Sequence, residues 1–291
     1  MSVTDHTRRK VLKMLGLGTI ALALPDLGES LASPSKPRIG LQLYSVRTHF
    51  DKDFEKTMRT IADIGIVGIE SYPLPESITL AHAGKVFRDL GLKVLGMHTE
   101  LPVGEQRDVA LRMADAYDCN MVIYPGWPEG EKYKTVEAMK HMVEVYNEAA
   151  AFLKTKGLRF GLHNHWWEFE KTDGMYPFYY LLKHLDKEIF FEIDTYWAKT
   201  GGLDPARVVR DFGKRAPLLH IKDGPAVKGE QSYAQVPAGE GSLDFRAIAR
   251  AGRKHTQWMI IEFDEYAKDI FDGIKKSYTF LVQNRLAAGR I

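Results

Sequence analysis

The sequence contains few of the features that mark disulfide-bonded, nucleic-acid-binding or membrane proteins. Its 291 residues include a single cysteine, Cys119, so no disulfide can form within the chain. Cys119 opens the apolar run CNMVIY, which favours a buried thiol over a nucleophile. The net charge is only +2, which gives no indication of a polyanion partner such as nucleic acid. No apolar stretch approaches the roughly 20 residues that a membrane-spanning helix needs.

The first 32 residues have the composition of an export signal. The segment TRRKVLK at 7–13 precedes the apolar stretch MLGLGTIALAL at 14–24, and small residues suited to cleavage follow. The paired arginines resemble a twin-arginine signal. We expect a signal peptide over 1–32, a linker over 33–37 and a periplasmic or otherwise exported protein without stable membrane association after signal removal. A basic, apolar N-terminal helix is the alternative.

From residue 38 onward, apolar runs alternate with segments of helical periodicity. The runs cover 38–44, 66–70, 92–98, 120–124, 158–169, 188–194, 217–223 and 257–263. The helical segments cover 53–64, 77–90, 106–117, 134–156, 176–185, 204–213, 243–253 and 267–285. Eight strand–helix pairs in about 250 residues predict one (β/α)8 TIM barrel over 38–291. An open doubly wound sheet is the alternative, but no G-x-G-x-x-G follows the first strand.

Four of the apolar runs end in side chains that can bind a divalent metal. They are Glu168, Asp194, His220 and Glu262. The carboxyl ends of the strands of a parallel barrel meet at one mouth, so we expect these groups to converge on one ion. Taken singly, each has a plainer interpretation: Asp194 suits the cap of a following helix, and Glu262 lies in an acidic segment typical of a solvated loop. The long region 223–242 could cover the mouth as a lid.

Several of these segments resemble the xylose-isomerase-like barrel superfamily, in its sugar isomerase/epimerase branch. They are HNHWWEF (163–169), IDTYWAKTGGLDP (193–205), LLHIKD (218–223), AGEGSLDF (238–245) and IIEFDEY (260–266). The resemblance implies a metal quartet formed by Glu168, Asp194, His220 and Glu262. His163 and His165 are alternatives for the first position. The resemblance also implies Mn²⁺ as the cofactor, with Mg²⁺, Co²⁺ and Zn²⁺ as alternatives.

The resemblance implies proton transfer next to a carbonyl or hydroxyl group of a sugar. Family members use two ligand glutamates as base and acid, which correspond here to Glu168 and Glu262. Because an exported enzyme meets few sugar phosphates, and the sequence offers no clear arginine cluster or phosphate loop, we expect a non-phosphorylated sugar or glycoside as substrate. Alternatives are a 3-keto-glycoside lyase or hydrolase on the same site, a metal-dependent apurinic endonuclease and a non-catalytic sugar-binding protein. A homo-oligomer stays open.

Further polar and aromatic side chains near the predicted strand ends are candidates for substrate binding. They are His98, His165, Lys222, Glu70, Tyr44 and Trp197. We expect His165 and Lys222 to donate hydrogen bonds to substrate oxygens, and His98 to orient a hydroxyl group or relay a proton. A packed core histidine is the alternative for His98. Four tryptophans near the mouth favour a carbohydrate, because aromatic faces stack on the C–H faces of sugars. These are Trp127, Trp166, Trp167 and Trp197.

Overall fold

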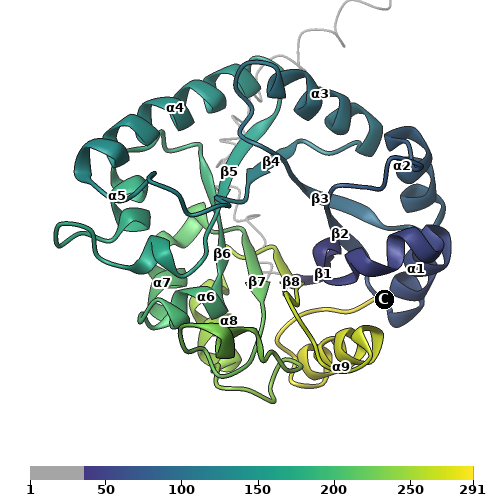
Figure 1. The fold of residues 1–291 in the computed structure, drawn as a ribbon. Helices are drawn as coiled ribbons and strands as arrows, with labels where there is room; N and C mark the ends of the chain where they lie inside the picture. Colours follow the sequence, from purple (N-terminus) through teal and green to yellow (C-terminus); the bar gives the residue numbers. More distant parts are fainter. Residues whose placement is uncertain (1–35, 291) are drawn as a thin grey trace, which may run out of the picture. The chain divides into compact units, whose positions relative to one another are not determined.

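Residues 36–290 are described by the computed structural model, and the predicted signal peptide lies outside them. Eight parallel strands follow one another around a closed barrel, as Figure 1 shows, and the first pairs with the last. They are β1 (Arg38–Gln42), β2 (Gly68–Ser71), β3 (Lys93–His98), β4 (Met121–Tyr124), β5 (Arg159–His163), β6 (Phe190–Asp194), β7 (Leu218–Ile221) and β8 (Trp258–Ile261). The predicted (β/α)8 barrel is therefore confirmed.

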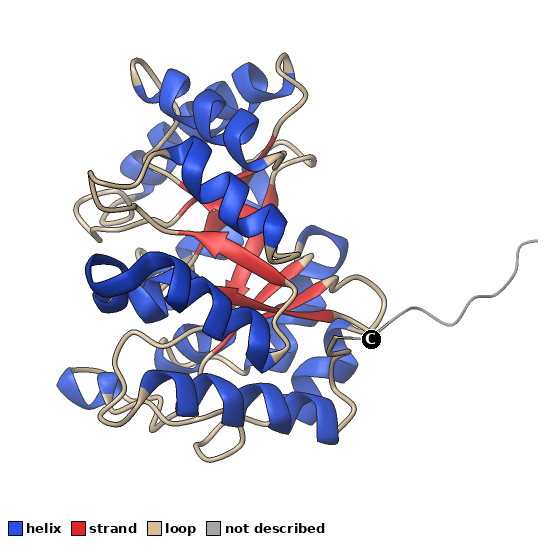
Figure 2. Ribbon diagram, turned by 90° about the vertical axis from the view of Figure 1, so that its right-hand side faces the viewer, coloured by secondary structure: helices blue, strands red, loops and turns tan. Residues whose placement is uncertain are grey.

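Helices surround the barrel, and in the side view of Figure 2 they enclose the strands. They are α1 (Phe50–Ile64), α2 (Leu80–Asp89), α3 (Gln106–Tyr117), α4 (Val136–Lys154), α5 (Pro177–His184), α6 (Thr195–Thr200), α7 (Pro205–Phe212), α8 (Phe245–Gly252) and α9 (Ile270–Gln283). In the described part of the chain, four short 3-10 helices lie in the connections: η1 (Leu43–His49), η2 (Trp167–Phe169), η3 (Gly213–Arg215) and η4 (Glu230–Tyr233). The sequence pattern anticipates eight of the nine α-helices found in residues 36–290, and the short α6 is additional.

The first helix illustrates how sequence determines these elements. In α1 the buried residues Phe54, Met58 and Ile61 recur at helical spacing and form one face against the barrel. The helix ends at Gly65, whose φ of 108° lies in the left-handed region that favours glycine. The Gly65 N–H donates to the carbonyl of Ala62, which closes the last turn.

The sixth strand shows which side chains enter the barrel. Phe191 packs against Phe178 of α5 and Phe212 of α7, at ring distances of 5.1 and 4.9 Å, so it faces the helices. Because side chains alternate along a strand, Phe190, Glu192 and Asp194 face the interior instead. The interior side chains thus change from apolar to acidic toward the carboxyl end of β6, and this end of the strand places the functional groups at the mouth.

Two further expectations concern the chain as a whole. Cys119 is buried, and burial raises its pKa to about 11, as expected for a thiol that packs in the core. In the described part of the chain, no helix has the length and apolar character needed to cross a membrane.

Candidate functional site

Asp194 ends β6, and its two oxygens differ as its sequence context suggests: one caps a helix and the other can bind a metal. Its Oδ1 accepts the N–H of Trp197 at 2.8 Å and caps α6, whereas its Oδ2 is buried without any hydrogen bond. The Asn164 side chain at the end of β5 fixes the strand end, because it accepts the N–H of Asp194 at 2.9 Å and donates to its carbonyl at 3.2 Å. One Asp194 oxygen therefore serves the fold, and the other, with only the Lys222 ammonium at 3.2 Å, can also bind a ligand.

His220 on β7 and Glu262 after β8 meet Asp194 at the mouth. The Nδ1 of His220 lies 2.5 Å from the Oε2 of Glu262 and 3.9 Å from the Oδ2 of Asp194. None of these three buried atoms makes a hydrogen bond, although all three lie within 4.8 Å of one another. Potential ligand atoms that converge in this way without hydrogen bonds are suited to a divalent cation. The structure thus brings together three of the four side chains expected at a metal.

Glu168 lies apart from these three residues, on η2 beyond the end of β5. Its Oε2 accepts the N–H of His165 at 2.8 Å, and its Oε1 is buried without a hydrogen bond. Gly126 packs beside it: a Cβ atom there would lie 3.1 Å from Oε1, and the φ of Gly126 is 77°. Burial raises the pKa of Glu168 to about 8. Within residues 36–290 it joins neither cluster of potential metal ligands, so its place in a metal quartet stays a prediction.

A second cluster lies deeper, below His220, and centres on Glu192. The Oε2 of Glu192 lies 2.8 Å from the Nε2 of His98, 3.1 Å from the Nδ1 of His163 and 3.1 Å from the Nε2 of His220. Glu70 on β2 adds a contact of 2.7 Å to the same Nε2 of His220. Of the two histidines offered as a first ligand, His163 belongs to this cluster and His165 to neither.

Glu192 is not among the predicted site residues, although strand alternation in the sequence indicates it. Glu192 precedes Asp194 by two residues in FFEID, and residues two apart on a strand face the same side. Asp264 follows Glu262 with the same spacing. Asp264 belongs to the acidic segment for which a solvated loop is the plainer interpretation, yet it binds Lys222 and Gln235.

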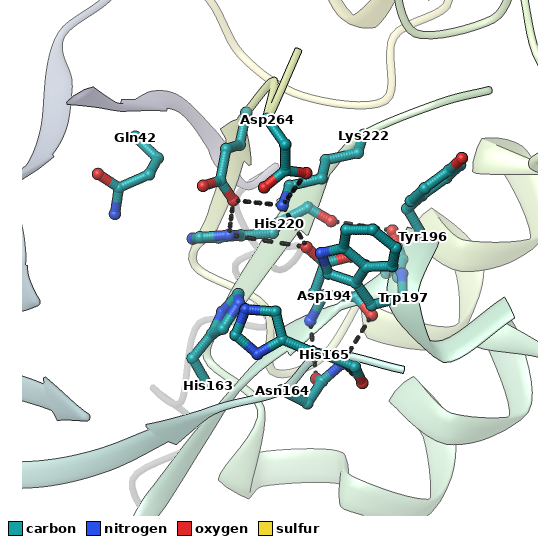
Figure 3. Close-up of polar contacts among 12 residues, drawn as sticks. Gln42, His163, Asn164, His165, Asp194, Tyr196, Trp197, His220, Lys222 and Asp264 are labelled. Carbon is teal, nitrogen blue, oxygen red and sulfur yellow. Dashed lines mark hydrogen bonds and ion pairs between the residues drawn. The ribbon is translucent and has the colours of Figure 1, made fainter. Parts of the chain in front are cut away.

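Lys222 places a cation between the acidic groups, as Figure 3 shows. Its Nζ lies 3.2 Å from Asp194, 3.0 Å from Glu262 and 2.8 Å from Asp264, and 5.2 Å from the ring centre of Trp197. Burial disfavours its charge, but the three carboxylates outweigh burial and raise the pKa of Lys222 well above its usual value.

The remaining substrate-binding candidates divide between the mouth and its surroundings. His165 stacks on Trp167 at a ring distance of 4.3 Å, and its Nδ1 has no partner. Trp197 is buried, with its indole N–H also unpartnered. Tyr44 lies in η1 under the guanidinium of Arg47, 3.7 Å from the ring centre, so packing accounts for much of its surface.

The charge balance of the buried groups favours a bound cation. Five acids with at most 15% side-chain exposure surround the interior: Glu70, Glu192, Asp194, Glu262 and Asp264. Burial and then the neighbouring Glu192 raise the pKa of Glu70 well above its usual value. Burial lowers the pKa of His163 to about 4, so this ring is neutral and compensates no charge. Lys222 and His220, whose pKa values these acids raise well above their usual values despite burial, compensate only part of this charge, so the residues present fit a divalent metal.

The connection 223–242 after β7 is tied down at both ends. The buried Asp223 accepts four backbone N–H groups, from Gly224, Gly239, Gly241 and Leu243, at 2.9, 2.9, 2.9 and 3.2 Å. Further along, Gln235 exchanges two hydrogen bonds of 2.7 Å with Asp264. These bonds favour a fixed wall of the mouth over the freely opening lid that the length of the loop suggests.

Comparisons with known proteins agree with this architecture. A family profile described as xylose isomerase-like TIM barrel matches residues 58–283. The chain is similar to the crystal structure of a sugar phosphate isomerase/epimerase from Parabacteroides distasonis, at 22% identity and a TM-score of 0.73, over 88% of this chain and 97% of that one. It is similar to a D-allulose 3-epimerase from Methylomonas sp. at 16% identity and a TM-score of 0.63, over 87% and 99% of the two chains.

A third solved structure, the IOLI protein with a bound zinc atom, is 12% identical with a TM-score of 0.66, over 85% of this chain and 98% of that one. Among curated proteins, no sequence matches. At these identities, the solved structures show the fold alone.

Proposed function

Because the chain belongs to the xylose isomerase-like TIM barrel family, we propose that it is a metal-dependent isomerase or epimerase of a non-phosphorylated sugar. One observation carries the proposal: Asp194, His220 and Glu262 direct buried ligand atoms, none of which makes a hydrogen bond, at one point of the barrel mouth. Active sites of barrels of this type lie at that end of the strands. Mn²⁺ is the cation we propose, since the set is rich in carboxylates and includes an imidazole. Two solved neighbours, whose names include isomerase or epimerase, support the reaction class.

A bound divalent cation would polarise a sugar carbonyl or hydroxyl oxygen and thereby acidify the adjacent C–H. Asp194, His220 and Glu262 would hold it. Lys222 lies among their carboxylates and can donate a hydrogen bond to a substrate oxygen while it limits the repulsion between them. The neutral ring of His165, at the edge of the mouth, can donate a second one.

The two glutamates assigned to proton transfer differ in their environments. Burial disfavours charge on Glu262, but Lys222 and His220 outweigh it and hold the pKa of Glu262 well below its usual value. Glu262 is therefore ionised and can accept a proton. Glu168, with a pKa near 8, is protonated at neutral pH and can return one. The two residues follow β8 and β5, so they approach a sugar in the mouth from different sides, as an epimerisation requires.

The charges near the mouth favour a sugar without a phosphate group. Lys222 is already surrounded by three carboxylates. Arg47 donates to the backbone carbonyls of Tyr44 at 2.8 Å and Asp264 at 3.0 Å, so its guanidinium is engaged. A phosphate would therefore meet more negative than free positive charge. We also propose that residues 1–32 direct export through the twin-arginine route, where non-phosphorylated substrates are to be expected.

A 3-keto-glycoside lyase or hydrolase is the second candidate, and the protonated Glu168 favours it. Both reactions begin when a base removes the proton next to the carbonyl. If a glycosidic oxygen leaves from the neighbouring carbon, an acid must protonate it, and a carboxyl group with a pKa near 8 is suited to that step.

The test is an NMR assay of the Mn²⁺-loaded protein with keto-sugars in D₂O. We expect deuterium to enter at one carbon, together with formation of an epimer or isomer; release of the aglycone would identify the lyase. The exposed Glu240→Gln is a matched control, and Glu262→Gln should lose most turnover. If the metal-loaded protein exchanges no C–H and forms no product on any keto-sugar, the proposal is wrong.

A further inference from the structure

One large aromatic side chain is left uncovered at the mouth. Trp127 is 56% exposed, more than any other large apolar side chain within residues 36–290. It lies in the connection from β4 to α4, at the same end of the barrel as Asp194 and Glu262. Val227, 42% exposed, lies in the connection after β7 at that same end. Apolar groups exposed beside an active site are common in ligand-binding surfaces.

Two neighbouring rings, those of His165 and Trp167, pack against Trp127 and fix its position. Its ring lies 5.6 Å from that of His165 and 5.5 Å from that of Trp167, at interplanar angles of 50° and 49°. The preceding residue, Gly126, packs against the Glu168 carboxyl group, which positions the connection. An indole that is fixed on one side and open on the other offers a preorganised stacking surface.

A continuous series of rings links Trp127 to the candidate metal site. The ring of His220 lies 4.6 Å from that of His163, His163 lies 5.1 Å from His165, and His165 lies 5.6 Å from Trp127. This series of three steps is longer than a single sugar ring, and a second ring joined to the first could follow it from His220 to Trp127.

Two lysines close to Trp127 in the chain already have partners, which favours an uncharged ring. Lys132 donates to the carbonyl of Pro128, and Lys134 forms an ion pair of 3.1 Å with Glu129. A neutral sugar or aromatic ring can stack on the indole through its C–H or π face without displacing these pairs.

We propose that Trp127 forms a subsite for a second ring, so that the substrate is a glycoside and not a free monosaccharide. This inference rests on the proposed function, because the first ring must bind at Asp194, His220 and Glu262. The ring on Trp127 is the aglycone or a second sugar, and it is uncharged.

The experiment measures binding to the full chain by calorimetry with excess Mn²⁺, in the Glu262→Gln background so that the probes are not consumed. The probes are 3-keto-glucose, its methyl β-glycoside and its phenyl β-glycoside. We expect the phenyl glycoside to bind about tenfold more tightly than the methyl glycoside. In Trp127→Ala this ratio should fall to near one, and Trp127→Phe should retain most of it. Val282→Ala, an exposed apolar residue on α9, is the matched control.

Several outcomes overturn the subsite: no preference for the phenyl glycoside, a preference that survives Trp127→Ala, or no binding of the phenyl glycoside at all. The proposed function is tested separately by C–H exchange in D₂O. A Trp127-dependent preference without exchange would leave the subsite and reject the isomerase. C–H exchange without a Trp127-dependent preference would support the proposed function and reject the subsite.

Discussion

Two buried aspartates at the same end of the barrel have opposite hydrogen-bonding states. Asp223, 1% exposed, accepts four backbone N–H groups, two on each oxygen. Asp194, fully buried at the end of the neighbouring strand, receives no hydrogen bond at Oδ2, and Glu262 receives none at Oε2; only the Lys222 ammonium lies near both oxygens, at 3.2 and 3.0 Å. A buried carboxylate that the backbone satisfies stabilises the fold. One that the protein leaves unsatisfied lowers stability by about 1–3 kcal/mol, and this cost points to a ligand.

The largest expected effect concerns the unsatisfied group on β8. Glu262→Gln keeps a metal-binding oxygen and nearly the same volume but removes the base. We expect turnover to fall by about 10²–10⁴, the usual contribution of a proton-transfer group, with modestly weaker Mn²⁺ binding. Steady-state kinetics at saturating Mn²⁺ measure this effect. If turnover is near normal with the metal in place, Glu262 is only a ligand, and His98 or His165 becomes the better candidate for the base.

The satisfied aspartate should show the opposite behaviour, with a large effect on stability. Asp223→Asn keeps one acceptor oxygen but directs an NH₂ group at backbone N–H donors. We expect the free energy of unfolding to fall by about 2–4 kcal/mol, since at least two amides lose their partner. Urea denaturation measures the change, and the exposed Glu230→Gln in the same loop is the control. A loss below about 1 kcal/mol would mean that the loop is held by its other contacts.

These acids also differ in how well the sequence predicts their positions. Strands and helices follow from hydrophobic periodicity, and the run EIFFEID predicts β6 and its end at Asp194 without any structure. His220 and Glu262 follow from the same argument, since parallel strands share one mouth. Glu192 could have been found with strand alternation, because it lies two residues before Asp194.

Other features could not be predicted from these patterns. Asp223 receives hydrogen bonds from the backbone N–H groups of Gly239, Gly241 and Leu243, and these carry no residue signature. The pairing depends on the path of an irregular loop, which periodicity does not describe. Glu168 is similar, since its position depends on the 3-10 turn of η2 after β5 ends. Sequence patterns therefore locate groups on strands better than groups beyond them.

The stabilisation of the folded protein by Mn²⁺ distinguishes Asp194 from Asp223. Mn²⁺ at 100 times its dissociation constant should raise the free energy of unfolding of the wild-type protein by about 2.7 kcal/mol, because it binds only the folded state. Asp194→Asn keeps the oxygen that caps α6 but loses a charged ligand, so at the same Mn²⁺ concentration the increase should largely vanish and return partly with excess metal. Without metal, this variant should be at least as stable as the wild type, unlike Asp223→Asn. Thermal unfolding with and without chelator checks both statements, and a metal-free Asp194→Asn less stable by more than about 1 kcal/mol would contradict them.

Glu168 is intermediate between these aspartates, because one oxygen accepts an N–H and the other makes no hydrogen bond. Its effect should appear as a dependence of the free energy of unfolding on pH. Its pKa in the folded protein, about 8, exceeds the ordinary value near 4.5, so the folded state binds the proton more tightly than the unfolded state does. The resulting stability is fully present below about pH 4.5, is lost as the pH rises toward 8 and then stays constant. Glu168→Gln cannot titrate, so the difference in unfolding free energy between variant and wild type should grow across this window, by at most about 1.4 kcal/mol per pH unit. Urea denaturation at a series of pH values measures the difference, in which the titrations of all other groups cancel to first order. The exposed Glu137→Gln should give a curve parallel to the wild type. Parallel curves for Glu168→Gln as well would show that Glu168 is ionised at neutral pH, and Glu168 could then no longer be the acid that returns the proton.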